Sequence, residues 1–317
     1  MASSKENNTK HLIVIGGPTA SGKTQLALQI AQHYQAEIIS TDSRQFYREM
    51  TIGTAKPSQA ELQQVPHHFI DSLSVLEEYS VGDFEQDALE KVNTLHLHHQ
   101  VVVAVGGSGL FIHALCHGLD TFPPVLPAIK EQVQHHFEKE GITWLQDTLQ
   151  QLDPAFYSKI DIHNPARLRR ALEVCLSSGQ PYSSFLGKNS GNRPFQIHYL
   201  LPEWPREVLY ARINQRVDKM IEQGLEQEAL LLRPHAHRTA LKTVGYEEWI
   251  PYFEGTCSKE EVIDKIKQHS RNYAKRQMTW FRKQSYWTLV PEANEIHALK
   301  AVQNAICLLY TSDAADE

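Results

Sequence analysis

The sequence contains few cysteines, and their spacing matches no metal-binding or disulfide framework. The four are Cys116, Cys175, Cys257 and Cys307, spread over 317 residues. Because no C-x-x-C pair occurs, the usual zinc clusters and the disulfide frameworks of small secreted domains are excluded. This cysteine usage is typical of a reducing compartment, and we expect a cytoplasmic location.

Long apolar runs are also missing. No stretch approaches the about 20 apolar residues that a membrane-spanning helix needs, so we expect no membrane partner. Residues 1–10 are polar and lack the apolar core of a secretory signal, and we expect them to be disordered. The net charge of −6 argues against a uniformly basic nucleic-acid binder but allows local basic patches. No coiled-coil or domain-swap pattern occurs, and we expect a monomer.

The histidines, although numerous, form no metal-binding tract. The 17 are scattered along the chain, and the adjacent pair His67 and His68 has no third ligand nearby in the sequence. Adjacent side chains on a strand point to opposite faces. We therefore assign both histidines structural roles.

A glycine-rich segment follows the first apolar run directly. Residues 17–24 read Gly-Pro-Thr-Ala-Ser-Gly-Lys-Thr and match the pattern G-x-x-x-x-G-K-[ST]; we call them the glycine loop. They lie between a predicted buried strand at 11–16 and a helical pattern that begins at Thr24. In this context backbone N–H groups and the helix N-terminus bind phosphate. Lys23 then reaches the outer phosphates and Thr24 holds Mg²⁺, so we expect a polyphosphate ligand with Mg²⁺ as cofactor.

Alternating strand and helix signals predict an α/β fold, with a parallel sheet flanked by helices. Residues 36–41, 101–105 and 195–201 read as further short strands, and strands that are apolar on both faces are typical of parallel sheets. A proline-rich break at 121–127 begins a mainly helical stretch without strand signals. The predicted organisation is a disordered N-terminus at 1–10, a P-loop core at 11–120 and 195–300, a helical insertion domain at 121–194, and an unstructured tail at 308–317.

The default ligand of such a loop is a nucleotide, but the acidic residue that accompanies the loop in nucleotide hydrolases is missing. The strand at 101–105 ends in Gly106-Gly-Ser-Gly-Leu110 rather than in the acidic residue that holds Mg²⁺ in nucleotide hydrolases. The nearest acid at a strand end is Asp42. On the residues alone, Asp42 suits a metal ligand, a helix cap or a general base equally well.

An ordered series of motifs resembles the tRNA dimethylallyltransferases, also called tRNA isopentenyltransferases, of bacterial type. The series runs from about residue 11 to residue 290, and as a whole it is far more specific than the glycine loop. After the loop, its blocks are Asp42-Ser-Arg-Gln-Phe-Tyr47, Met50-Thr-Ile-Gly-Thr-Ala-Lys-Pro57, Pro66-His-His-Phe-Ile-Asp71, Gly106-Gly-Ser-Gly-Leu110, Arg167-Leu-Arg-Arg-Ala-Leu-Glu173, Arg212-Ile-Asn-Gln-Arg216, Val244-Gly-Tyr-Glu247 and Ala274-Lys-Arg-Gln-Met-Thr-Trp-Phe-Arg282.

The resemblance implies an activity and two substrates. The dimethylallyl group of dimethylallyl diphosphate moves to N6 of adenosine 37, beside the anticodon of tRNAs that read codons starting with U, and diphosphate leaves. The implied diphosphate-binding residues are Gly17, Pro18, Thr19, Ala20, Ser21, Gly22, Lys23, Thr24 and Arg216. Asp42 is the implied general base, Lys23 and Arg216 stabilise the departing diphosphate, and Arg212 is the second candidate for the arginine.

The implied tRNA partner directs attention to basic residues. Residues 271–283 carry five positive charges and no acid, and on a helix Arg271, Lys275 and Arg282 share one face while Arg276 and Lys283 form a second stripe. We expect Tyr273, Trp280 and Phe281 to pack in the core. By resemblance, the residues that contact the anticodon stem-loop are Asp42, Ser43, Arg44, Gln45, Ser108, Lys130, Arg167, Arg169, Arg170, Arg271, Lys275, Arg276 and Arg282.

Three rival functions remain open on the sequence. A P-loop kinase of small molecules or nucleotides uses the same loop for ATP, but the missing acid and the basic segment 271–283 argue against it. An adenylate dimethylallyltransferase uses the same donor but lacks an insertion like 121–194. An RNA-binding regulator with a vestigial loop has no need of the intact Lys23, Thr24 and Asp42.

Overall fold

The computed structural model describes residues 9–188 and 191–312, with side-chain surroundings as far as residue 306. The chain divides into two compact units. One consists of the residues up to Cys116 together with those from Arg193 onward, and the other is His117–Asn192. The range of the second unit overlaps the helical insertion predicted at 121–194.

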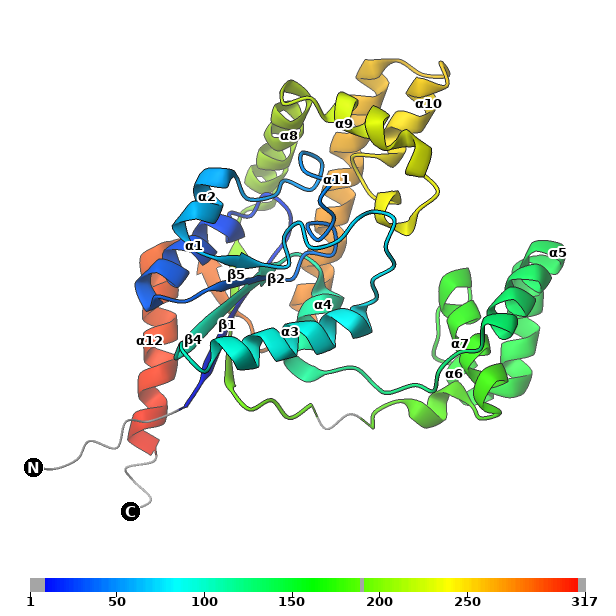
Figure 1. Ribbon diagram of the computed structural model, residues 1–317, viewed down its shortest axis with the longest axis horizontal. Coiled ribbons are helices and arrows are strands. Elements are labelled where there is room, and N and C mark those ends of the chain that lie inside the picture. Colours follow the sequence, from blue (N-terminus) through cyan, green and yellow to red (C-terminus); the bar gives the residue numbers. More distant parts are fainter. Residues whose placement is uncertain (1–8, 189–190, 313–317) are drawn as a thin grey trace, which may run out of the picture. The chain divides into compact units, whose positions relative to one another are not determined.

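The first unit is built on a sheet of six parallel strands in the order β3-β2-β4-β1-β5-β6 (Figure 1). The strands are β1 (His11–Gly16), β2 (Ile38–Ser40), β3 (His67–His68), β4 (Val101–Gly106), β5 (Gln196–Glu203) and β6 (Thr288–Pro291). The register pairs His11 with Val101 and Gly16 with Gly106. The predicted α/β fold is confirmed, and the two glycine-containing turns therefore begin side by side.

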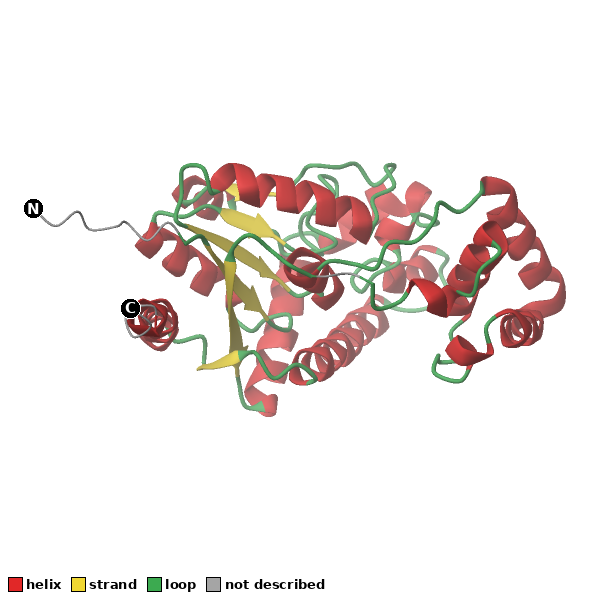
Figure 2. Cartoon of the chain, turned by 90° about the horizontal axis from the view of Figure 1, so that it is seen from below, coloured by secondary structure: helices red, strands yellow, loops and turns green. Residues whose placement is uncertain are grey.

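Helices cover both faces of the sheet (Figure 2). Ile13 and Ile15 of β1 pack on the face covered by α1 (Lys23–Tyr34) and α12 (Glu295–Ser312). Leu12 and Val14 pack on the opposite face, against α3 (Val81–Leu95), α4 (Gly109–His117) and the end of α11 (Lys259–Arg282). Because successive side chains of a strand point to opposite faces, burial on both sides explains the unbroken apolar runs.

A third apolar cluster holds the C-terminal helices against the loop after β2. Tyr47 and Met50 from that loop pack with Val217, Trp249 and Ile266. The elements that contribute are α8 (Arg206–Glu222), α9 (Leu225–Leu232), η3 (Thr239–Leu241), η4 (Glu247–Trp249) and α11. The remaining short helices of this unit are α2 (Gln59–Gln64), η2 (Arg233–His235) and α10 (Ile250–Phe253). Helices far apart in sequence thus share one core beside the sheet.

The second unit has a helical core of its own. It contains α5 (Pro127–Leu152), α6 (Pro154–Tyr157), α7 (Pro165–Ser178) and η1 (Tyr182–Phe185). The side chains of Val133, Leu145, Leu149, Leu168 and Leu172 are fully buried within it. Gly141, with a φ of 73°, kinks α5, so the long helix is two helices joined at a glycine.

The C-terminal helix corrects one prediction. The helix α12 continues to Ser312, so the prediction of an unstructured tail from residue 308 is wrong for residues 308–312. No glycine or proline occurs from Glu295 to Ser312, and nothing in the sequence therefore interrupts the helix. Residues 313–317, and residues 1–8 of the predicted disordered N-terminus, lie outside the described residues.

Within residues 9–188 and 191–312, no helix is both long enough and apolar enough to cross a bilayer.

The adjacent histidines His67 and His68 have separate partners. His68 Nε2 lies 2.6 Å from a carboxylate oxygen of Glu37, and His67 Nδ1 lies 2.7 Å from the carbonyl oxygen of Val65. Both histidine rings therefore form hydrogen bonds to other residues of the first unit.

Histidines also gather at the amino-terminal end of the sheet. His11 Nδ1 lies 3.0 Å from His198 Nε2, and the buried His96 ring stacks on Phe195. Burial lowers the pKa of His96 and of His198, in each case from 6.5 to about 4. The folded protein thus holds these rings neutral under conditions in which the unfolded chain protonates them.

We predict that acid destabilises the protein through this cluster. Between pH 6.5 and about 4 the unfolded chain binds the extra protons, so each ring lowers the free energy of unfolding by up to about 1.4 kcal/mol per pH unit as the pH falls. Above pH 6.5 the stability is fully present. Urea denaturation at several pH values should show a shallower pH dependence for His198→Gln than for the exposed control His297→Gln. Equal pH dependence in the two variants contradicts the assignment.

Candidate active site

The site lies at the carboxyl edge of the sheet, where two turns meet. The last residues of β1 and β4, Gly16 and Gly106, are paired across the sheet. The glycine loop follows Gly16, and the Gly106–Leu110 turn begins at Gly106. Gly22 adopts a φ of 86° and caps α1, whose first turn has no side-chain cap. The amides at this helix N-terminus are therefore available to an anion, which is the usual ligand position of open parallel sheets.

One cavity in the first unit brings together predicted residues from three distant segments. Its lining includes Lys23, Asp42 and Arg216, which come from α1, the loop after β2, and α8. Other predicted residues that line it are Thr19, Thr24, Arg44 and Gln45. Ser108 is outside the lining but contacts Ser43 nearby. The structure thus brings four of the nine predicted diphosphate-binding residues to a single space, namely Thr19, Lys23, Thr24 and Arg216.

Positive charge exceeds negative charge in this cavity. Lys23 Nζ donates to the Pro18 carbonyl oxygen at 3.2 Å. Burial and the neighbouring Arg216 lower the pKa of Lys23 to about 8, against the opposing effect of Asp42. Burial also lowers the pKa of Arg216, whose Nε is buried and has no hydrogen-bond partner among the described residues. Two cations around one carboxylate, one of them with an unused donor, make a binding site for an anion.

The structure separates the two candidate arginines of α8. Arg212 Nε donates to the Ala20 carbonyl oxygen at 2.8 Å, and its guanidinium lies 4.4 Å from the centre of the Trp204 ring. Trp204 Nε1 in turn donates to the Ser21 carbonyl oxygen at 2.8 Å. Arg212 and Trp204 therefore hold the glycine loop in place, whereas Arg216, one helical turn later, faces the cavity.

Gln277 of α11 connects the two turns and was not predicted from the sequence. Its Oε1 accepts from the Thr19 backbone N–H at 3.1 Å, and its Nε2 donates to the Gly107 carbonyl oxygen at 2.8 Å. A side chain at Gly107 would collide with Gln277. The available signal was a polar residue on an otherwise apolar helix stripe, between the buried residues Ala274 and Phe281.

The segment that contains Asp42 is fixed by short-range hydrogen bonds. Asp42 Oδ1 accepts from the Arg44 backbone N–H at 3.0 Å. Ser108 Oγ accepts from the Ser43 backbone N–H and also donates to Ser43 Oγ, each at 3.1 Å. These contacts orient the Asp42 carboxylate at the cavity, which makes it available as a base or as a ligand.

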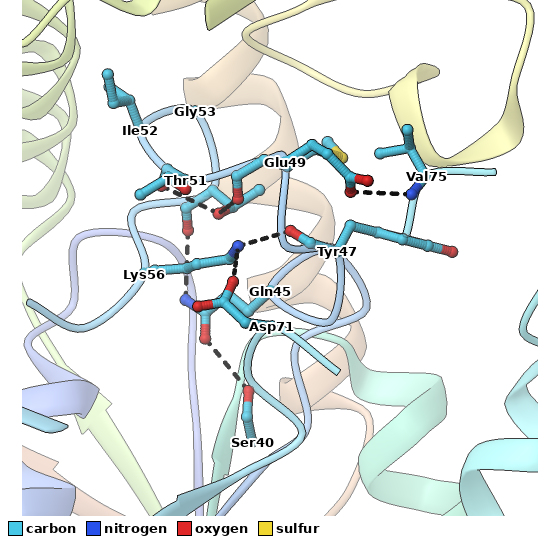
Figure 3. A network of polar contacts seen from close by, with 12 residues as sticks. Ser40, Gln45, Tyr47, Glu49, Thr51, Ile52, Gly53, Lys56, Asp71 and Val75 are labelled. Carbon is cyan, nitrogen blue, oxygen red and sulfur yellow. Dashed lines mark hydrogen bonds and ion pairs between the residues drawn. The ribbon is translucent and has the colours of Figure 1, made fainter. Parts of the chain in front are cut away.

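Gln45 lines the cavity and forms hydrogen bonds through both the oxygen and the nitrogen of its side-chain amide. Its Oε1 accepts from Ser40 Oγ at 3.2 Å (Figure 3). Its Nε2 donates to the carbonyl oxygens of Thr54 and Ala55 at 3.3 and 3.2 Å. Nearby, the buried Lys56 side chain donates to the Tyr47 carbonyl oxygen and pairs with Asp71. Gln45 therefore lines the cavity while it fixes the loop that follows.

Tyr273 and His67 line the cavity although the sequence did not predict them there. Tyr273 lines the cavity and is 36% exposed, so the prediction that it packs in the core is wrong. It lies about one helical turn before Gln277 and shares that residue's orientation toward the cavity. Phe281 is fully buried as predicted, and Trp280 packs against the same cluster. His67 also lines the cavity, although it was assigned only a structural role.

The predicted basic face of α11 is largely open. Lys275, Arg276 and Arg282 are exposed, and the Arg276 guanidinium lies 5.6 Å from the centre of the Tyr273 ring. Arg271 Nη1 donates to Asn214 Oδ1 at 2.6 Å and is thus tied to α8. Most of this positive surface remains available to a polyanion.

The helical unit presents its predicted basic residues unequally. Lys130 and Arg167 are exposed. Arg169 donates to Gln134 and lies 5.3 Å from the centre of the Phe137 ring, while Arg170 lies 5.6 Å from the ring of Phe122. Arg169 is therefore held inside the unit, whereas Lys130, Arg167 and Arg170 are all exposed.

The cavity also offers oxygen atoms that suit Mg²⁺. Thr24 and Asp42 both line it, and they supply a hydroxyl and a carboxylate. Among the described residues, no group of three or more His, Cys, Asp or Glu side chains could hold a metal ion by itself. A hydroxyl with a single carboxylate fits Mg²⁺, which commonly takes its other ligands from substrate phosphates and water.

Comparisons with known proteins show the family of this chain. The sequence profile of the IPP transferase family matches residues 45–284. A tRNA dimethylallyltransferase of Christiangramia forsetii is 50% identical over 275 residues, which cover 87% of this chain and 91% of that protein.

Solved structures agree as well. A full-length tRNA isopentenylpyrophosphate transferase from Bacillus halodurans has a TM-score of 0.70 and 33% identity, and the match covers 97% of this chain and 100% of that one. A eukaryotic dimethylallyltransferase acting on tRNA has a TM-score of 0.81 and 25% identity, with 96% of this chain and 80% of that one covered. The extent of these matches shows that the chain belongs to the IPP transferase family, together with enzymes named tRNA dimethylallyltransferases.

Proposed function

We propose that this protein transfers the dimethylallyl group of dimethylallyl diphosphate to N6 of adenosine 37 in tRNAs that read codons starting with U. The observation that carries the proposal is the cavity in which Lys23 and Arg216 face the Asp42 carboxylate. Two cations suit a departing diphosphate, and a carboxylate beside them suits a base for the incoming amine. The products are N6-(dimethylallyl)adenosine and diphosphate.

The glycine loop is proposed to hold the diphosphate. Backbone amides at the start of α1, with Lys23 and Arg216, neutralise the charge that gathers on the leaving group as its C–O bond to the allyl carbon breaks. Mg²⁺, where Thr24 and the phosphates bind it, supplies further charge stabilisation. Arg212, Trp204 and Gln277 keep the loop in one conformation, so that little reorganisation is needed during the reaction.

Asp42 is proposed to act as the general base. The exocyclic amine of adenine is a weak nucleophile because its lone pair is delocalised into the ring, and it therefore needs close placement. As N6 bonds to the allyl carbon, one N6 proton passes to the Asp42 carboxylate. The hydrogen bond from the Arg44 amide fixes the orientation of that carboxylate.

The tRNA is proposed to approach over basic surfaces on both units. Lys275, Arg276 and Arg282 of α11 are exposed, as are Lys130 and Arg167 of the helical unit. Such side chains contact phosphates, while the target adenosine must leave the stacked anticodon loop to place N6 in the cavity. We further propose that the protein acts as a cytoplasmic monomer, with Mg²⁺ as cofactor.

Product analysis tests the proposed reaction. The purified protein is incubated with Mg²⁺, dimethylallyl diphosphate and unmodified tRNA that reads a codon starting with U, and the digested nucleosides are analysed by mass spectrometry. We expect N6-(dimethylallyl)adenosine among the nucleosides, and none when the same tRNA carries guanosine in place of adenosine 37. Parallel reactions contain AMP in place of tRNA, or ATP with small alcohols. Prenylated AMP, or phosphorylated product without prenylated tRNA, overturns the proposal.

Replacing the base should separate chemistry from binding. Asp42→Asn keeps the size of the side chain and its acceptor for the Arg44 amide but removes the basic carboxylate. We expect kcat to fall by about 1,000-fold or more, while the Kd for tRNA changes by less than about threefold. Single-turnover rates and filter binding measure the two quantities. A large loss of tRNA affinity with little loss of the bound rate makes Asp42 a recognition residue instead.

The lowered pKa of Lys23 predicts a pH dependence of donor binding. Below pH 8 the ammonium is charged and attracts the diphosphate, and above pH 8 its charge is lost. The Kd for diphosphate should therefore rise through pH 8 to 9 by up to about tenfold per pH unit. Calorimetric titration of wild type and Lys23→Arg measures this, since the arginine stays charged throughout. The same pH dependence in both proteins contradicts the assignment to Lys23.

A further inference from the structure

A glutamate outside the predicted site collects hydrogen bonds from three consecutive backbone amides. Glu228 Oε2 accepts from the N–H groups of Thr51 and Ile52 at 3.1 and 2.8 Å. Its Oε1 accepts from the Gly53 N–H at 3.0 Å and from the Tyr246 hydroxyl at 2.7 Å. The loop at 51–53 thus forms an anion-binding nest, and the protein fills it with its own carboxylate from α9.

These contacts hold two walls of the cavity. Gly53, Thr54 and Ala55 line one wall, and residues 243–245 line another. Gly53 belongs to the first wall, and Tyr246 directly follows the second. Both donate hydrogen bonds to Glu228. The ring of Tyr246 lies so close to Gly53 that a Cβ placed there would be 2.6 Å from it. Both walls therefore depend on one carboxylate.

The same loop is linked to the Asp42 segment. Gln45, three residues after Asp42, donates to the carbonyl oxygens of Thr54 and Ala55. Glu228 holds the loop at residues 51–53, and Gln45 holds it at residues 54–55. A continuous set of hydrogen bonds thus runs from α9 to the turn that orients the proposed base.

We propose that Glu228 is a positioning residue for the side of the cavity that receives the nucleotide. It acts through the loop at 51–55 and Gln45, and its four partners all lie outside the glycine loop. This rests on the proposed function for the identity of the nucleotide. Loss of its charge should weaken placement of the target adenosine and leave the donor site intact.

The isosteric variant Glu228→Gln is a sharp test because its partners all donate. If the amide NH₂ faces Thr51 and Ile52, two backbone donors lose their acceptor. If it faces Gly53 and Tyr246, the Gly53 amide loses its acceptor, while the tyrosine hydroxyl can reverse its role. Burial and Glu228 raise the pKa of Tyr246, so in the native protein the hydroxyl stays protonated and donates.

The matched control lies on the same helix. Glu226 pairs with Lys259 at 2.6 Å rather than with the loop at 51–53, so Glu226→Gln removes a carboxylate of α9 away from the cavity wall. Tyr246→Phe removes only the hydroxyl, and the double variant with Glu228→Gln measures the coupling between the two residues. Melting temperatures of all four variants report general destabilisation.

Steady-state kinetics with tRNA and dimethylallyl diphosphate carry the main readout. For Glu228→Gln we expect kcat/KM for tRNA to fall about 30-fold or more, and KM for the donor and Kd for diphosphate to stay within about twofold of wild type. Hydrogen exchange should become faster in a peptide that spans 50–57 and stay unchanged across the glycine loop. Tyr246→Phe should show a smaller loss of the same kind.

Either of two kinetic results overturns the proposal. One is a Glu228→Gln enzyme whose kcat/KM for tRNA lies within about threefold of the Glu226→Gln control. The other is a parallel loss of donor and tRNA parameters that follows the melting temperature, because it assigns Glu228 to general stability. Should wild type itself form no prenylated tRNA, the proposed function fails, and direct tRNA binding with hydrogen exchange at 50–57 then decides the role of Glu228. If Glu228→Gln then shows the tRNA affinity and the hydrogen exchange at 50–57 of wild type, the proposed role of Glu228 is overturned.

Discussion

Excess positive charge in one cavity is the constraint on which the rest of the site depends. Lys23 and Arg216 approach each other in a space where Asp42 is the nearby counter-charge, and their pKa values are lowered by burial and, for Lys23, also by Arg216. Such an arrangement is costly unless an anion completes it. The surrounding contacts have the form expected of a scaffold that keeps these cations in place.

The scaffold has two anchors, and both come from the helices that follow β5. Gln277 joins Thr19 of the glycine loop to Gly107 of the neighbouring turn. Glu228 joins the loop at 51–53 to Tyr246. The first anchor serves the proposed donor side and the second the proposed nucleotide side. The C-terminal helices therefore complete a cavity whose anion-binding loop lies near the start of the chain.

Local patterns were sufficient to predict the fold, because its main signals are short-range. The apolar runs at 11–16 and 101–105 predicted buried parallel strands, and the glycine loop between strand and helix predicted the ligand edge. The prediction of an unstructured tail is wrong for residues 308–312, because a break in the sequence pattern there does not end the helix. Tyr273 was misassigned because a helix face that lines a cavity resembles a core face in its sequence.

Site residues with distant partners could not be found in the same way. The partners Gln277 and Thr19 are 258 residues apart, and Glu228 and Gly53 are 175 apart. Nothing in either local pattern indicates its partner. The choice between Arg212 and Arg216 also needed the structure, since the two lie one helical turn apart and only their partners separate them.

Comparative binding to the glycine loop tests the central claim most directly. An unreactive thiolo analogue of dimethylallyl diphosphate and a non-hydrolysable ATP analogue are titrated calorimetrically into wild type and Arg216→Gln, with Lys219→Gln as a control on the exposed face of α8. The account predicts that the allyl analogue binds wild type at least about tenfold more tightly than the ATP analogue. It also predicts that Arg216→Gln, unlike Lys219→Gln, removes this affinity. Tighter binding of the ATP analogue, or equal affinities of the allyl analogue for Arg216→Gln and Lys219→Gln, contradicts the account.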